Sequence, residues 1–60
     1  MADWFLIKES SGFEFFEPFE NRAKAIESAA KWDAEVIRQA TIVETAALDN
    51  GDAEWIKETL

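Results

Sequence analysis

The residues of this sequence with the clearest capacity for chemistry are its carboxylates. Two pairs, Glu14 with Glu17 and Glu54 with Glu58, have spacings at which one carboxyl group could act as a general acid and the other as a general base. Such a pair needs a cleft that holds the substrate, and a chain of 60 residues can hardly enclose one. We therefore expect no catalytic residues and a protein that is not an enzyme.

The remaining chemical groups also predict no metal site and no cofactor. The sequence has no His and no Cys, which excludes a histidine acid–base catalyst, a thiolate nucleophile and a thiolate zinc site. The acidic segment 49–54 lacks the twelve-residue spacing and the closing Glu of an EF-hand calcium loop. Gly12 and Gly51 are isolated, so the sequence contains no glycine-rich phosphate loop.

Net charge is the strongest compositional signal. Thirteen acidic residues against six basic ones leave a formal charge of −7, and the acidic residues are spread along the whole chain. We expect no direct binding to nucleic acid, because no basic patch is available to displace the counterions of the phosphates. An acidic surface suits a protein partner with a basic surface, such as a nucleic-acid-binding enzyme. The competing interpretation is that the charge serves only solubility.

Composition predicts one folded domain spanning residues 1–60. Hydrophobic residues make up 48% of the chain and aromatic residues 13%, which is too apolar for a disordered tail. The early apolar run at residues 4–7 is far too short to cross a bilayer, so we expect no membrane segment. A Cys-free chain without a basic, apolar leader is expected in the cytoplasm.

The first third of the chain predicts a β-hairpin. Residues 3–9 are rich in aromatic and β-branched side chains and are apolar on both alternating faces, which indicates an interior strand. Residues 10–12, Ser-Ser-Gly, form a turn signal, and residues 13–17 resume an extended pattern. Pro18 is expected to end the pairing or to mark an edge.

A helix is predicted next, over residues 22–32, with Asn21 as its N-cap. Its five alanines give high intrinsic helix propensity. The small residues would allow a close approach to the sheet, while aromatic rings from the strands fill the remaining volume. The predicted inward stripe consists of Ile26, Ala29 and Ala30, with Ala23 and Ala25 as further candidates.

Two interpretations are open for the rest of the chain. Residues 41–45 are β-branched and predict a strand, which would form a hairpin with residues 53–58 around Asn50-Gly51. Apolar residues between 36 and 48 also recur at helical spacing, which would make residues 49–52 a helix C-cap. We favour the strand, and so an α+β fold with one antiparallel sheet, one helix on one face and the order β-β-α-β-β. The alternative order is β-β-α-α.

The surplus of aromatic residues predicts an interaction surface. Eight Phe and Trp side chains are more than one small core can easily bury, so we expect Trp4, Phe16 or Trp55 to be partly exposed. Nearby carboxylates would complete a partner-binding surface with these rings. The candidate carboxylates are Glu14, Glu17, Glu20, Asp52, Glu54 and Glu58.

Two classes of function fit these patterns. The first is a small acidic interaction module, whose sharper form is a nucleic-acid mimic with carboxylates spaced like phosphates along a strand, since residues i and i+2 lie roughly 6.5–7 Å apart. The second is a structural homodimer formed by edge strands or exposed aromatic rings. In size, charge and element order the chain resembles small bacteriophage and prophage proteins, some of which inhibit host nucleases or CRISPR effectors. This resemblance implies, as an alternative function, a nucleic-acid-mimicking inhibitor of such an enzyme.

Overall fold

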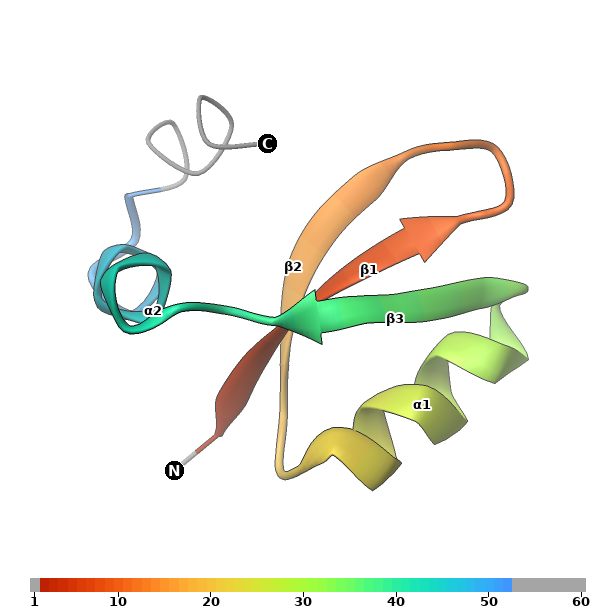
Figure 1. Cartoon of the computed structure of the whole chain (residues 1–60), viewed down its shortest axis with the longest axis horizontal. Coiled ribbons are helices and arrows are strands. Elements are labelled where there is room, and N and C mark those ends of the chain that lie inside the picture. Colours follow the sequence, from red (N-terminus) through yellow and green to blue (C-terminus); the bar gives the residue numbers. More distant parts are fainter. Residues whose placement is uncertain (1, 53–60) are drawn as a thin grey trace.

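A three-stranded antiparallel sheet with two helices forms the fold, and the computed structural model describes residues 2–52 of the chain (Figure 1). The sheet has the strand order β2-β1-β3, with β1 in the centre and antiparallel to both neighbours. The α+β class and the antiparallel sheet are therefore confirmed. In chain order the elements are β1 (Asp3–Glu9), β2 (Glu14–Phe19), α1 (Arg22–Lys31), β3 (Ala34–Gln39) and α2 (Ile42–Asp49).

The central position of β1 follows from its two apolar faces. Phe5, Leu6 and Ile7 are all buried, although successive strand residues point to opposite faces. The turn to β2 closes through a hydrogen bond that the Gly12 amide donates to the Glu9 carbonyl, 2.9 Å long, and Gly12 has a φ of +97° that suits glycine. The predicted hairpin and the predicted interior strand are both confirmed.

Helix α1 begins at the predicted N-cap, since the Asn21 side chain accepts a 2.9 Å hydrogen bond from the Lys24 amide. Ala25 and Ala29 are buried against Phe5 and Ile7 and form the core with them. The predicted inward stripe is wrong in part, because Ile26 is 50% exposed and Ala23 and Ala30 are exposed too. Small side chains contact the sheet because the Phe rings of the strands fill the space between the layers, and Ile26 then lies about 100° around the helix from Ala25.

The segment after α1 corrects the predicted order. Strand β3 starts at Ala34, and residues 41–45, predicted as a strand, lie at the start of α2. A capping box explains this helix start. The Thr41 hydroxyl accepts a hydrogen bond from the Glu44 amide at 3.1 Å, and Glu44 Oε1 accepts one from the Thr41 amide at 2.9 Å. These paired bonds outweigh the strand preference of the β-branched residues that follow Thr41.

The predicted hairpin turn at Asn50-Gly51 is also wrong, because this dipeptide ends α2. Gly51 has a φ of +78°, and its amide donates to the Leu48 carbonyl while the Asp52 amide donates to the Ala47 carbonyl. This pair of bonds is a Schellman motif, so the alternative prediction of a C-cap at residues 49–52 is confirmed. The predicted last strand at 53–58 lies outside the described residues. The order of the described elements is β-β-α-β-α.

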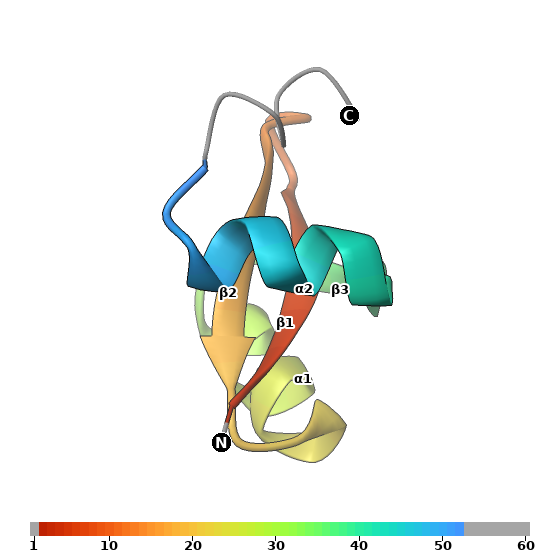
Figure 2. The same ribbon diagram turned by 90° about the vertical axis from the view of Figure 1, so that its left-hand side faces the viewer.

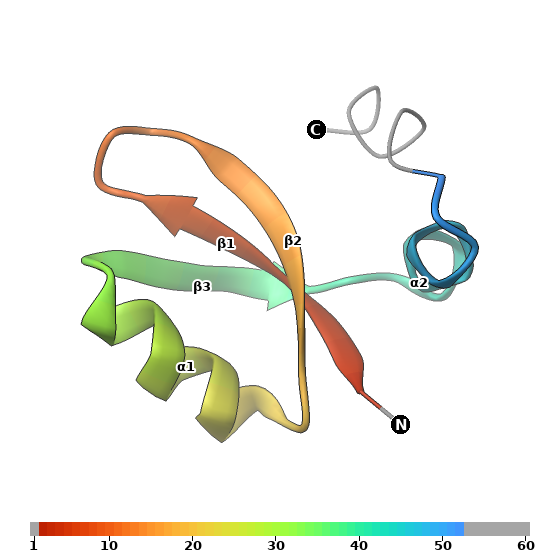
Figure 3. The same ribbon diagram turned by 180° about the vertical axis from the view of Figure 1, so that it is seen from behind.

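The two helices lie on opposite sides of the sheet (Figure 3). Helix α1 packs along β3 on the face that carries Phe5 and Ile7. Helix α2 runs across the strands, in front of β1 and β2 in Figure 2. One face of the sheet is therefore closed by α1, whereas the other face is only partly covered by α2.

Candidate functional site

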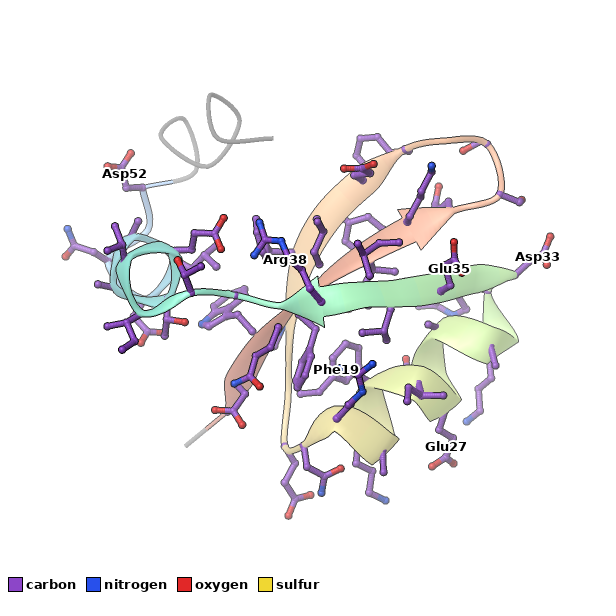
Figure 4. The ribbon with its side chains drawn as sticks, viewed as in Figure 1. Phe19, Glu27, Asp33, Glu35, Arg38 and Asp52 are labelled. Atoms are coloured by element: carbon purple, nitrogen blue, oxygen red, sulfur yellow. The ribbon has the colours of Figure 1, made fainter. Side chains whose placement is uncertain are left out.

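The sheet face away from α1, here called the α2 face, carries the candidate site. Strand register assigns its members, because every residue paired with Trp4, Leu6 or Lys8 of β1 shares their face. Figure 4 agrees with this assignment: Glu35 points away from α1, and Phe19 lies on the α1 side of the sheet. The paired members of the α2 face are Glu14, Phe16 and Pro18 of β2 and Glu35 and Arg38 of β3.

A bidentate ion pair fastens α2 to this face. Arg38 Nη1 donates to Glu44 Oε1 at 2.7 Å, and Arg38 Nη2 donates to Glu44 Oε2 at 2.9 Å. The Glu44 residue is only 2% exposed, and the Arg38 guanidinium also lies 5.7 Å from the centre of the Phe16 ring. Figure 4 shows Arg38 between β3 and α2. Two parallel hydrogen bonds and an aromatic ring thus orient one guanidinium and one carboxylate.

The ion pair keeps Glu44 charged. The hydrogen bonds from Arg38 are the main cause that lowers the pKa of the Glu44 carboxyl to about 2, and they outweigh the burial that would raise it. The hydrogen bond from the Thr41 amide lowers this pKa further. The same pairing raises the pKa of the Arg38 guanidinium. At neutral pH this Arg and this Glu neutralise each other and offer no free charge to a ligand.

A β-bulge places Arg38 on the α2 face. Val36 pairs with Ile7 and packs against the core, whereas Arg38 pairs with Leu6 on the opposite face. In a regular strand Val36 and Arg38 would share a face, because they are two residues apart. The register shift opposite Leu6 and Ile7 inserts Ile37 as the extra residue. Without this irregularity the alternation of β3 would leave Arg38 on the α1 side, away from Glu44.

Trp4 provides a second attachment for α2. Its indole Nε1 donates a 2.8 Å hydrogen bond to Asp49 Oδ1, at the last residue of the helix. The Trp4 carbonyl accepts a 2.8 Å hydrogen bond from the Ala40 amide, in the connection that leads into α2. Helix α2 is therefore held to the sheet near both of its ends, and the orientation of the indole is set by the same contact.

An open groove of about 500 Å³ lies beside this indole, between the start of β1, the end of β2 and α2. We call it the Trp4 groove. Its wall combines apolar surface with the carboxylate of Asp49, which forms no ion pair within residues 2–52. Asp3 borders the groove, but strand register assigns its side chain to the α1 side together with Phe19. The lining residues are Ala2, Asp3, Trp4, Pro18, Thr45 and Asp49.

A second open groove, of about 360 Å³, lies where the β1–β2 turn meets the start of β3. Its wall contains Lys8 together with three carboxylates, at Glu9, Asp33 and Glu35, and no aromatic ring. No group of three or more acidic side chains in the described part of the chain is placed to hold a metal ion. Without an aromatic wall or a side chain fixed by a hydrogen bond, this groove offers less for recognition than the Trp4 groove.

The structure brings together three of the predicted site residues. Trp4, Glu14 and Phe16 share the α2 face, and all three are partly buried rather than fully exposed. Glu17 lies on the opposite face, because it is an odd number of residues from Glu14 along the same strand. A single row of phosphate-like carboxylates is therefore not formed along β2.

The other predicted site residues lie apart from this cluster. Glu20 is exposed in the turn between β2 and α1, and Asp52 is exposed in the segment that caps α2. Three predicted site residues lie outside the described part of the chain: Glu54, Trp55 and Glu58.

Sequence reasoning missed the residues that attach α2 to the sheet. The spacing of Thr41 and Glu44 is a capping-box signature and could have identified the start of the helix. Arg38 is the lone charge in the apolar segment 36–43, which could have marked it as a paired group. No local pattern indicates that Asp49 reaches Trp4, since 45 positions separate them.

Comparisons of the chain with protein-family models, curated proteins and solved structures found no significant match. Among residues 2–52, no helix combines the length and apolar character needed to cross a bilayer. The features of the molecule that bear on its function are therefore the Trp4 groove, the α2 face and the charges around them.

Proposed function

We propose that this protein is a small non-enzymatic interaction module that binds a basic surface of a protein partner through its α2 face. The uneven distribution of charge carries this proposal. Helix α1 holds Arg22, Lys24 and Lys31 against a single acidic residue, Glu27, for a local charge of +2. Because the whole chain carries −7, the residues outside α1 carry −9.

The positions of the basic side chains support the α2 face as the binding surface. Helix α1 keeps its three cations on the opposite side of the sheet. Arg38 is neutralised by Glu44, so Lys8 is the remaining basic residue that strand register places on the α2 face among the described residues. The electrostatic potential on this side is therefore negative, because it is set by the carboxylates of Glu14, Glu35 and Asp49.

Such a surface favours a partner whose own surface is basic, and proteins that bind nucleic acid present surfaces of that kind. Long-range attraction between the two surfaces raises the association rate and disfavours acidic competitors. The proposal does not require phosphate mimicry, because Glu14 and Glu17 lie on different faces.

Affinity capture from nuclease-treated bacterial lysate at low and high salt tests the proposal. We expect a basic protein to be retained at low salt and released at high salt, since exposed charge pairs are screened. The retained protein is then purified, and its Kd is measured against two matched variants, Glu14→Gln and Glu17→Gln, which remove the same charge from opposite faces of β2.

Glu14→Gln should weaken binding about two- to fivefold, the usual range for one exposed ion pair, and Glu17→Gln should change it by less than about twofold. Equal effects of the two variants would contradict the α2 face as the binding surface. Retention of nothing but the protein itself would instead support a homodimer. A turnover activity that is lost on replacing these carboxylates would overturn the non-enzymatic function.

A further inference from the structure

We infer that the Trp4 groove is the recognition site for a single arginine side chain of the basic partner. This inference rests on the proposed function and specifies the chemistry of the ligand. The groove offers the two features that such a side chain needs: an apolar and aromatic wall for its methylene stem and the Asp49 carboxylate for its guanidinium.

The indole of Trp4 is already oriented for this contact. Its only hydrogen-bond donor, Nε1, is occupied by Asp49 Oδ1 at 2.8 Å, so a ligand gains nothing by offering an acceptor to the ring. Trp is the aromatic side chain that attracts cations most strongly. Asp49 holds the ring through one oxygen and keeps its second carboxylate oxygen, Oδ2, for a donor on the ligand.

The two contributing side chains come from different elements. Trp4 lies on β1 and Asp49 on α2, so the guanidinium would bridge the sheet and the helix. Asp49 has no ion-pair partner within residues 2–52, and its carboxylate disfavours an acidic ligand. The volume of about 500 Å³ lies in the range of sites that hold a small ligand.

The protein itself contains the same arrangement a short distance away on the α2 face. Arg38 lies over the Phe16 ring and donates two hydrogen bonds to the Glu44 carboxylate. A planar guanidinium satisfies an aromatic ring and a carboxylate together, whereas a lysine ammonium is a more strongly hydrated point charge. The Trp4 groove repeats the aromatic and carboxylate components but lacks the guanidinium, so we assign arginine in preference to lysine as its ligand.

NMR titration of the ¹⁵N-labelled full chain tests the inference with three defined peptides. They are blocked pentapeptides with two glycines on each side of Arg, Lys or citrulline, which has the shape of arginine without its charge. We expect the Arg peptide to shift the Trp4 indole N–H signal with saturation, the Lys peptide to bind at least about threefold more weakly, and the citrulline peptide to cause no saturable shift. Equal shifts with Arg and Lys would overturn the preference for arginine, and a saturable shift with citrulline would overturn the role of charge.

Two groove variants and one matched control complete the test. Asp49→Asn, whose amide oxygen can still accept the hydrogen bond from the Trp4 indole, should weaken binding of the Arg peptide about two- to fivefold. Trp4→Leu should weaken it about three- to tenfold, as read from the backbone amides of Thr45 and Asp49. Glu27→Gln removes a charge from α1 and should leave binding unchanged. If Trp4→Leu disturbs the fold, the Asp49→Asn comparison still decides, and unchanged binding in that variant would overturn the inference.

The failure of this inference is distinguishable from the failure of the proposed function. If lysate capture and the Glu14 and Glu17 comparison succeed while the Arg peptide leaves the Trp4 signal unmoved, the module binds a basic partner by another part of the α2 face. If the peptide binds as expected but no partner is captured, the groove recognises arginine and the proposed function is the part that fails.

Discussion

The Glu44 carboxylate shows how one residue determines the position of a whole helix. It accepts two hydrogen bonds from Arg38 and one from the Thr41 amide while it is almost completely buried. Each hydrogen bond to a charged group contributes about 1.5–3 kcal/mol, against the cost of burying the carboxylate. Because Arg38 is 41% exposed, it stays partly hydrated if its partner is lost.

Replacing Glu44 with Gln should therefore lower the free energy of unfolding by about 1–3 kcal/mol. Urea denaturation followed by circular dichroism measures the change. The exposed Glu27→Gln substitution in α1 is the matched control and should change the free energy by less than about 0.5 kcal/mol. Equal stability of the two variants would show that the ion pair does not hold α2 in place.

The pH dependence of stability should carry the signature of the same carboxylate. The pKa of Glu44 is about 2 in the folded protein, below its ordinary value of 4.5. A carboxyl group with a lowered pKa stabilises the fold above the unfolded-state value and loses this contribution as the pH falls through the folded-state value. The free energy of unfolding of the wild-type protein should therefore fall between pH 4.5 and pH 2. The Glu44→Gln variant lacks this carboxylate, so its free energy of unfolding should fall less over the same range. Urea denaturation at each pH measures both. Parallel pH curves for the two proteins would contradict this linkage.

At the scale of elements, the bulge in β3 decides which face Arg38 joins. Val36 and Arg38 lie on opposite faces although they are two positions apart in the sequence, because Ile37 is an extra residue in the ladder. A strand without Ile37 would alternate regularly and would keep Val36 on the α1 side and Arg38 on the α2 face.

Deletion of Ile37 should consequently be tolerated, whereas deletion of Val36 should not. The first deletion removes the irregularity and preserves both faces, and the second removes a residue that packs against the core. We expect the Ile37 deletion to remain folded and to retain the pH dependence that Glu44 produces. Unfolding of both variants to the same extent, by thermal denaturation, would contradict the bulge assignment.

At the scale of the whole molecule, the uneven distribution of charge is the property on which the proposed binding depends. Helix α1 holds a local excess of basic residues, and the rest of the chain carries the acidic excess. A molecule of this kind has a preferred orientation as it approaches a basic surface, which increases the association rate more than it strengthens the final complex.

Binding to the captured partner should therefore depend on salt mainly through its association rate. Raising the salt concentration from about 0.05 to 0.5 M shortens the Debye length severalfold, and we expect the association rate to fall at least about tenfold while the dissociation rate changes by less than about threefold. Surface plasmon resonance measures both rates. A dissociation rate that carries most of the salt dependence would contradict a steering role for the acidic surface.

Local sequence determined much of this protein. The apolar run in β1 specified a central strand, the Ser-Ser-Gly turn specified the hairpin, and Asn21 with the following alanines specified α1, because each of these signals acts between neighbours in the chain. Composition likewise established the acidic charge and the absence of His and Cys.

Only the tertiary structure decided which contacts residues 34–49 make. The capping box at Thr41 is a local signal for the start of α2, whereas the ion pair that holds the helix on the sheet needs the bulge in β3 to place Arg38 beside Glu44. The Trp4 groove depends on β1, β2 and α2 meeting, and its closing hydrogen bond joins Trp4 to Asp49 across 45 positions. Contacts over such distances leave no local pattern, which is why the candidate site became visible only in the folded chain.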